Sequence, residues 1–159
     1  MRLLLLRHGI AEDPGPATGH RDEPRALTPE GRERMRAQAR GMARLGIVAE
    51  AVVTSPLVRC RQTAEIVAAA LGTAAREDPR LRPGARLDQV EDVMIDHPGA
   101  EALLLCGHQP DLSVIVAELT GGGRVEFRKG SLAVLDVDRP PRPGGGLLRA
   151  LHPPAALRL

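Results

Sequence analysis

Apolar residues in this sequence are concentrated in short runs. Three of these runs are almost continuously apolar, namely Met1–Leu6, Ala49–Thr54 and Glu101–Cys106. A strand with one face in water alternates apolar and polar residues, whereas a strand buried on both faces does not, which is typical of parallel sheets. The three runs therefore predict buried, parallel β-strands. Ser131–Val137 alternates better and predicts a further strand, and Leu147–Leu151 predicts a last one.

Helix start and stop signals separate these strands. Thr28 and Ser55 are each followed by proline, so an N-cap residue stands directly before the residue that favours the first helical position. Gly46 and Gly72 are suited to the turns that end these two helices. The predicted helices are Pro29–Leu45, Pro56–Leu71, Leu87–Ile95 and Pro110–Leu119.

The order of these elements predicts a fold class. Strands that alternate with helices form βαβ units, in which helices cover both faces of a parallel sheet. We therefore expect an α/β protein, a three-layer α/β/α sandwich with a mostly parallel central sheet, formed by a single domain over residues 1–159. In such folds the ligand binds outside the carboxyl ends of the strands. The residues at the strand ends are therefore the first candidates for a functional site.

Composition excludes several classes of partner. The 159 residues are 43% hydrophobic and 26% charged, as in a folded globular protein. Phe127 is the only Phe, Tyr or Trp, so the sequence lacks the stacking platforms that bind single-stranded nucleic acid. A net charge of +2 predicts no strong attraction to nucleic acid or to a membrane. Leu3–Leu6 is too short to cross a membrane, and Cys60 and Cys106 are expected to be buried free thiols, so we expect a cytoplasmic protein.

Basic and imidazole side chains stand at the ends of the three apolar strands. The first strand is followed by Arg7 and His8, the second leads into a helix with Arg59 in its first turn, and the third is followed by His108. If the strands are neighbours, these side chains meet at one edge of the sheet, beside helix N-termini that attract anions. Guanidinium and imidazole groups in this arrangement suit a dianionic phosphoryl group.

The same residue types indicate a reaction. Neighbouring arginines lower the pKa of histidine and favour the neutral imidazole, which is the form that can attack phosphorus. Fixed guanidinium groups stabilise the charge on the equatorial oxygens of the transferred group. One histidine then forms a covalent phosphohistidine, while the other donates hydrogen bonds to the oxygens. Gly9 leaves room for the backbone to approach the ligand.

Four segments of the chain carry a resemblance to a known family. They are Leu6-Arg7-His8-Gly9, Leu27-Thr28-Pro29-Glu30-Gly31, Ser55-Pro56-Leu57-Val58-Arg59-Cys60-Arg61-Gln62-Thr63-Ala64 and Gly107-His108-Gln109-Pro110. In this order they resemble the histidine phosphatase superfamily, which is known by its RHG motif and is also called phosphoglycerate-mutase-like. The likeness spans nearly the whole chain and is greatest to the SixA branch of bacterial phosphohistidine phosphatases.

The resemblance implies a role for each matching residue. His8 would be the nucleophile, and Arg7 and Arg59 would bind the phosphate. His108 would complete the pocket. Arg25 falls where SixA-like proteins carry a further arginine near the site. No metal and no cofactor would be needed.

The expected substrate is a phosphohistidine in a phosphorylated protein. Larger relatives place a glutamate after the SPxxR helix as general acid, whereas this chain has no such motif there. An alkoxide leaving group needs a proton donor, whereas an imidazole leaving group depends less on such a donor. A phosphomonoesterase for sugar or nucleotide phosphates and a non-catalytic phosphate-binding module are the open alternatives. The carboxylates without an assigned role in that region are Glu77, Asp78, Asp88, Glu91 and Asp92.

Other polar residues favour structural roles. His20, His97 and His152 lie in loop-like contexts, and we expect them to be exposed. Cys106, His108 and His97 lack the spacing of a metal site. The basic run of the first predicted helix is interspersed with glutamates and predicts a solvated face rather than a docking surface. Its arginines are Arg32, Arg34, Arg36, Arg40 and Arg44.

Overall fold

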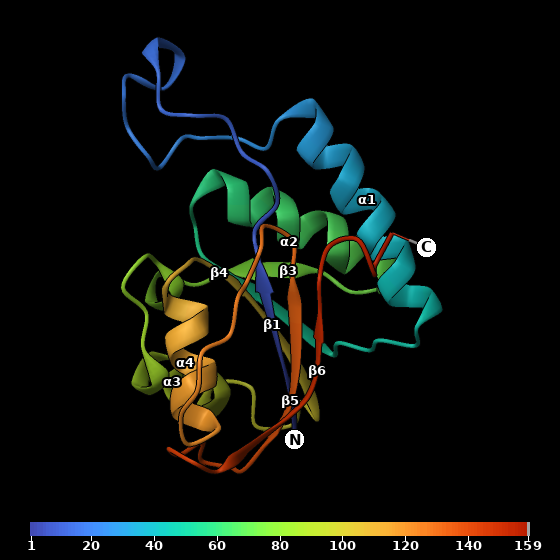
Figure 1. The fold of residues 1–159 in the computed structure, drawn as a ribbon, viewed down its shortest axis with the longest axis vertical. Helices are drawn as coiled ribbons and strands as arrows, with labels where there is room; N and C mark the ends of the chain where they lie inside the picture. Colours follow the sequence, from blue (N-terminus) through green and yellow to red (C-terminus); the bar gives the residue numbers. More distant parts are fainter. Residues whose placement is uncertain (159) are drawn as a thin grey trace.

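A six-stranded mixed sheet forms the centre of the protein, and helices cover both of its faces (Figure 1). The computed structural model describes residues 1–158, so Leu159, the last residue of the predicted domain, lies outside the described part. Across the sheet the strands follow the order β3-β2-β4-β1-β5-β6. Their bounds are β1 Arg2–Arg7, β2 Ala51–Thr54, β3 Ala75–Glu77, β4 Ala102–Gly107, β5 Leu132–Val137 and β6 Gly146–His152.

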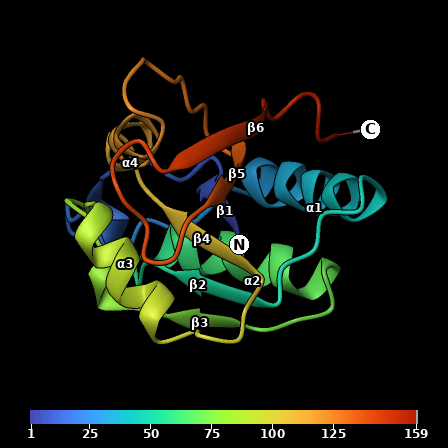
Figure 2. The ribbon, with the colours of Figure 1, turned by 90° about the horizontal axis from the view of Figure 1, so that it is seen from below.

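The layers agree with the predicted sandwich. Strands β1 to β4 are parallel where they pair, whereas β5 and β6 extend the sheet beyond β1 in antiparallel pairs. Helices α1 (Pro29–Arg44) and α2 (Val58–Ala70) pack on one face, and α3 (Leu87–Ile95) and α4 (Asp111–Leu119) pack on the other (Figure 2). Within residues 1–158, no helix combines the length and the apolar character that a membrane crossing requires. The predicted α/β/α fold with a mostly parallel sheet is confirmed.

Strand β1 shows why the first apolar run does not alternate. Leu3 and Leu5 belong to the core cluster beneath α3 and α4, whereas Leu4 and Leu6 belong to the cluster beneath α1 and α2. All four side chains are 0% exposed. Burial of one such leucine stabilises a fold by about 1.5–3 kcal/mol. A strand between two helical layers therefore uses apolar residues at every position.

The long loop between β1 and α1 is held at both ends. Ala11 and Leu27 form an isolated antiparallel bridge across the base of the loop. The hydroxyl of Thr28, the predicted N-cap, accepts a hydrogen bond from the amide of Gly31 at 2.9 Å. The loop projects beyond the end of β1 in Figure 1. Because its base is fixed at the carboxyl edge of the sheet, its residues can reach the ends of the neighbouring strands.

The start of α2 differs from the prediction. The helix begins at Val58 rather than Pro56, and Leu57, not Ser55, is its N-cap residue. The amide of Ser55 donates to the carbonyl of Cys106 at 3.0 Å, so Ser55 continues the pairing between β2 and β4. Because Ser55 is still paired in the sheet, it lies too far before the first turn of α2 to be its N-cap residue.

Strand β3 was not predicted from the sequence. It has three residues, of which two are exposed, and it pairs with β2 at the edge of the sheet. An edge strand of this length contains too few positions to show a hydrophobic pattern.

Candidate active site

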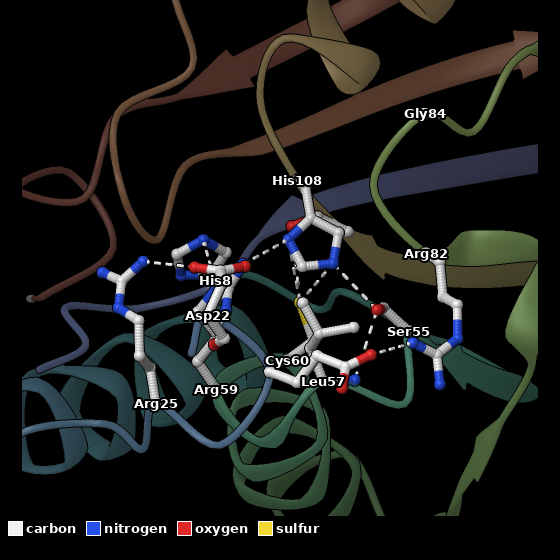
Figure 3. Close-up of polar contacts among 12 residues, drawn as sticks. His8, Asp22, Arg25, Ser55, Leu57, Arg59, Cys60, Arg82, Gly84 and His108 are labelled. Atoms are coloured by element: carbon white, nitrogen blue, oxygen red, sulfur yellow. Dashed lines mark hydrogen bonds and ion pairs between the residues drawn. The ribbon is translucent and has the colours of Figure 1, made fainter. Parts of the chain in front are cut away.

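The candidate site lies at the carboxyl edge of the sheet, where neighbouring strands end together. In the register of β1 and β4, Arg7 pairs with Gly107. His8 and His108 follow these two residues directly, and the centroids of their rings are 5.6 Å apart (Figure 3). Level strand ends therefore bring together two histidines that are far apart in the sequence.

His8 is held as a neutral imidazole with one unprotonated ring nitrogen. Its Nδ1 lies 2.8 Å from the carbonyl oxygen of Gly9, which can only accept, so Nδ1 carries the proton. Its Nε2 accepts a hydrogen bond from Nε of Arg59 at 3.3 Å. Burial and, to a smaller extent, the positive charges of Arg59 and Arg7 lower the pKa of His8 to about 3, although the hydrogen bond to the carbonyl of Gly9 acts in the opposite direction. The lone pair on Nε2 thus faces a guanidinium group at neutral pH.

Arg59 connects the two histidines. It lies in the first turn of α2, as predicted, and is 4% exposed. Its Nη2 is 3.3 Å from Nδ1 of His108, and a guanidinium nitrogen can only donate, so this ring nitrogen accepts. Nε2 of His108 therefore carries the proton and donates to the hydroxyl of Ser55 at 2.8 Å. The guanidinium group of Arg59 thus selects the tautomer of His108 and donates to the unprotonated Nε2 of His8.

Two residues from the β2–α2 segment position His108. Besides the hydroxyl of Ser55, Sγ of Cys60 lies 3.5 Å from Nε2 of His108. Cys60 and Cys106 are both free and buried, as predicted. Ser55 and Cys60 belong to the segment that carries the family resemblance, but residue type alone does not show that they contact a histidine on another strand.

Arg7 completes the basic group. Its Nη1 donates to the carbonyl of Phe127 at 2.7 Å. Its Nε is buried and has no hydrogen-bond partner within residues 1–158. Burial lowers the pKa of Arg7, yet a guanidinium keeps its charge at any physiological pH. The structure therefore brings Arg7, His8, Arg59 and His108 together, and the buried Nε of Arg7 remains available as a donor.

Asp22 is a site residue that the sequence did not reveal. Its Oδ2 accepts from Nη2 of Arg59 at 2.8 Å, and its Oδ1 accepts from Nη1 of Arg25 at 2.7 Å (Figure 3). Burial raises the pKa of Asp22, but the hydrogen bonds from Arg25 and Arg59 outweigh this effect and hold the pKa below its usual value. Arg25 therefore reaches the site through Asp22. A loop aspartate carries no periodic signal, so only the folded loop places it here.

The carboxylates considered as general acids lie elsewhere. Glu77 pairs with Arg61 at 3.5 Å, and Asp78 pairs with Arg80 at 2.6 Å. Asp88, Glu91 and Asp92 are residues of α3. Within residues 1–158, none of these five has a hydrogen bond or ion pair with the two histidines or with Arg7 or Arg59. The carboxylate that does contact the site, Asp22, is held in its ionised form.

The position that a side chain would take at Gly9 is occupied by protein. A Cβ at this position would lie 2.7 Å from Cγ of Met35 in α1. The amide of Gly9 donates to the hydroxyl of Thr63 at 3.0 Å, and that hydroxyl donates to the carbonyl of Arg59 at 2.7 Å. The glycine is therefore required by a close approach to α1, which differs from the predicted approach to a ligand, and the hydrogen bonds of its amide link β1 to α2.

The remaining histidines have no contact with this site. His20 is exposed, as expected, whereas His97 and His152 are half-buried, in contrast to the prediction. Nδ1 of His97 donates to the carbonyl of Val93 at 2.8 Å, which satisfies the end of α3. Within residues 1–158, no group of three or more His, Cys, Asp and Glu side chains is arranged to hold a metal ion.

The low pKa of His8 predicts a dependence of stability on pH. An exposed histidine in the unfolded chain has a pKa of about 6.5, whereas His8 in the folded protein titrates at about 3. Between these values the unfolded state binds a proton that the folded state rejects, so the free energy of unfolding rises with pH. The contribution approaches about 1.4 kcal/mol per pH unit. Urea unfolding between pH 4.5 and 8 measures it as the difference between the native protein and His8→Gln.

The matched control for this measurement is His152→Gln, because this half-buried histidine lies on β6 and outside the site. We expect His152→Gln to keep the pH dependence of the native protein and His8→Gln to reduce it. Equal slopes for all three proteins would show that His8 is not held neutral.

Comparison with known proteins identifies related sequences. The sequence profile of the histidine phosphatase superfamily (branch 1) matches residues 3–83. An uncharacterized protein of Picosynechococcus sp. (strain ATCC 27264 / PCC 7002 / PR-6) is 43% identical over 117 residues, which cover 70% of this chain and 68% of that protein. A probable phosphoglycerate mutase GpmB of Serratia proteamaculans (strain 568) is 36% identical over 98 residues, which cover 60% of this chain and 43% of that protein.

The fold is also similar to a solved structure. The protein histidine phosphatase SixA, complexed with tungstate, has a TM-score of 0.85 and 26% sequence identity, with 99% of each chain covered. The profile match includes the segment that carries Arg7, His8 and Arg59. The match to the family profile and the similarity of the fold lead to the same assignment. The chain belongs to the histidine phosphatase superfamily.

Proposed function

We propose that this protein is a metal-independent phosphohistidine phosphatase that acts on a phosphorylated protein. The observation that carries the proposal is the contact between Nε2 of His8 and the guanidinium group of Arg59. A nucleophile that faces a fixed cation is directed at the place where that cation would hold a phosphoryl group. The similarity to SixA, which is a protein histidine phosphatase, supports the choice of substrate.

The first step transfers the phosphoryl group to His8. Nε2 of His8 forms a bond to phosphorus, and the bond between phosphorus and the substrate's imidazole nitrogen breaks. The electron pair of the broken bond goes to the leaving imidazole. Arg7 and Arg59 stabilise the charge on the equatorial oxygens in the transition state, and His108 donates a hydrogen bond to one of them. To make this hydrogen bond, the N–H at Nε2 of His108 exchanges its present acceptor, the hydroxyl of Ser55, for the phosphoryl oxygen.

The second step releases phosphate. Water attacks the phosphorus of phospho-His8, the bond between phosphorus and Nε2 breaks, and the proton lost by the water leaves with the phosphate and solvent. The hydrogen bond from Nδ1 of His8 to the carbonyl of Gly9 holds the ring in the same orientation throughout. The residues to which we assign this chemistry are thus His8, His108, Arg7 and Arg59, while Gly9 and Arg25 shape the site through their neighbours.

The protonation state of the carboxylate in the site favours a phosphoramidate substrate over a phosphate ester. An alkoxide leaving group needs a general acid. Asp22 is the carboxylate in contact with the site, and its lowered pKa leaves it without a proton to donate at neutral pH. A phosphohistidine whose second ring nitrogen carries a proton leaves as a neutral imidazole, so breakage of its P–N bond requires no acid from the enzyme.

A small-molecule phosphatase is the second candidate function. The observation in its favour is the similarity to a probable phosphoglycerate mutase over 98 residues. The two candidates differ in the leaving group that each must expel, and substrate preference therefore distinguishes them.

Release of inorganic phosphate from a phosphohistidine protein and from a panel of sugar and nucleotide phosphates tests the proposal. We expect the phosphohistidine protein to have the higher kcat/KM, and we expect a chelator to leave turnover unchanged. A preference for the sugar phosphates would establish the second candidate instead. Phosphate binding without release from any compound would identify a binding module.

A further inference from the structure

A cavity adjoins the candidate active site on the side of α1. Its volume is about 560 Å³, and it lies between α1, the segment before β5 and the segment that follows β6. Figure 1 shows the chain after β6 beside α1, and Leu157 of that chain packs in the same core cluster as Met35 and Met42 of α1. Arg7 and Gly9, the neighbours of His8 in the chain, line this cavity, so it lies next to the site around His8. We call it the basic cavity.

Positive charge dominates the walls of the basic cavity. Its lining includes Arg34 from α1, Arg128 and Lys129 from the segment before β5, and Arg158, and no aspartate or glutamate is among the lining residues. Lys129 has no hydrogen bond or ion pair from its side chain within residues 1–158. A group of cations that come from three segments of the chain creates a positive potential that attracts anions.

Two of these cations have carboxylate partners outside the cavity. Arg34 pairs with Glu30 one turn earlier in α1, and Arg128 pairs with Glu126 at 3.3 Å. All four of these side chains are largely exposed. Exposed pairs of this kind contribute little free energy and exchange readily with a competing anion. They reduce the positive potential without preventing a partner's carboxylate from binding.

We propose that the basic cavity binds acidic side chains that flank the phosphohistidine of the protein substrate. This inference rests on the proposed function and adds the surface by which the substrate is recognised. Because Arg7 and Gly9 belong to both places, a phosphohistidine over His8 places neighbouring residues of the same protein against the cavity.

The exposure of the cavity's cations favours a protein, rather than a small anion, as the molecule that binds there. Arg34 and Arg128 are long, exposed side chains, and each would hold a single anionic group only weakly. A small metabolite held by its phosphoryl group over His8 has few further anionic groups with which to reach the cavity. A protein surface presents several carboxylates at once, and their weak contacts add while the phosphoryl group holds the complex in register.

A paired variant in two walls of the cavity tests the proposal. Arg34→Gln combined with Lys129→Gln removes two charges and leaves the residues assigned to the chemistry intact. The substrates are two phosphohistidine peptides, one with flanking glutamates and one with glutamines at the same positions, and phosphoramidate as a small probe. Arg40→Gln is the matched control, because Arg40 is an exposed arginine of α1 outside the lining.

We expect the paired variant to lose about tenfold in kcat/KM for the acidic peptide, through KM, as two exposed ion pairs would give. The glutamine peptide and phosphoramidate should be turned over as by the native protein, and Arg40→Gln should match the native protein on all three. Added salt should weaken the preference for the acidic peptide. An equal loss on both peptides, or a loss on phosphoramidate, would overturn the proposal.

A binding measurement separates this proposal from the proposed function. The unphosphorylated acidic and glutamine peptides are titrated into the native protein and the paired variant, with fluorescence anisotropy as the readout. We expect the native protein to bind the acidic peptide more tightly and the variant to lose that difference. Equal binding of both peptides to the native protein would refute the acidic docking surface, whereas absence of turnover would refute only the phosphatase assignment.

Discussion

Replacement of His8 by alanine is expected to abolish turnover, with a loss of about 10⁴-fold or more in kcat, as removal of a nucleophile causes in other enzymes that act through a covalent intermediate. The reason is specific to Nε2, whose lone pair faces Arg59 at 3.3 Å. Among residues 1–158 the other imidazole of the site belongs to His108, whose Nε2 carries the proton that it donates to the hydroxyl of Ser55 and therefore has no lone pair with which to attack. Steady-state release of phosphate from the preferred substrate measures the effect.

A labelled intermediate provides the decisive readout for the same variant. With a ³²P-labelled substrate, rapid quenching should trap a phosphoenzyme that is stable to base and labile to acid, and peptide mapping should place the label on His8. His8→Ala should give no labelled protein while it retains the circular dichroism spectrum of the native chain. A label on His108, or substantial turnover by His8→Ala, would contradict the assignment.

Arg59→Ala is expected to lower kcat by about 10²–10³-fold, which is the usual cost of one lost donor to the transition state. This buried guanidinium contacts both histidines and the carboxylate of Asp22. In the proposed mechanism, its removal takes away the charge that stabilises the phosphoryl oxygens, together with the contact to His108. Arg59→Lys should recover little activity, because an ammonium group cannot donate in two fixed directions. Steady-state kcat and KM measure both variants.

The control for Arg59 is Asp22→Asn. Arg59 also holds the loop between β1 and α1 through Asp22, so a loss in Arg59→Ala could arise from a displaced loop. Asp22→Asn removes the charge of the pair and leaves the guanidinium in place. We expect Asp22→Asn to keep kcat within about threefold of the native value, since a partly exposed ion pair contributes little. A loss as large as that of Arg59→Ala would show that Arg59 acts by holding the loop.

The electrostatics of the site explain why Asp22 is there. Arg7, Arg25 and Arg59 would otherwise place positive charge around two imidazoles at the edge of the sheet. Asp22 pairs with two of these arginines, Arg25 and Arg59, and neutralises part of that charge. In the proposed function, an arriving dianion would compete with the Asp22 carboxylate for Arg59, and the half-exposed carboxylate would have room to move toward solvent.

Much of the fold was accessible from the sequence because the relevant interactions are local or periodic. The continuous apolar runs identified β1, β2 and β4, since a strand between two helical layers has no polar face. Thr28 identified the start of α1, because capping depends on residues within one turn. Strand β3 and the start of α2 were missed, since both depend on pairing with segments far away in the chain.

The sequence by itself determined which residues stand at the strand ends, and with the topology of a parallel sheet this was enough to place His8, His108, Arg7 and Arg59 at one edge. Only the tertiary structure decided how they interact. The protonated nitrogen of each histidine, the lowered pKa of His8, the pairing of Asp22 with Arg59 and the basic cavity beside α1 all depend on distances between distant segments. Spacing along a chain predicts which residues share an edge, whereas hydrogen bonds and burial depend on atomic separations that arise only when the layers pack.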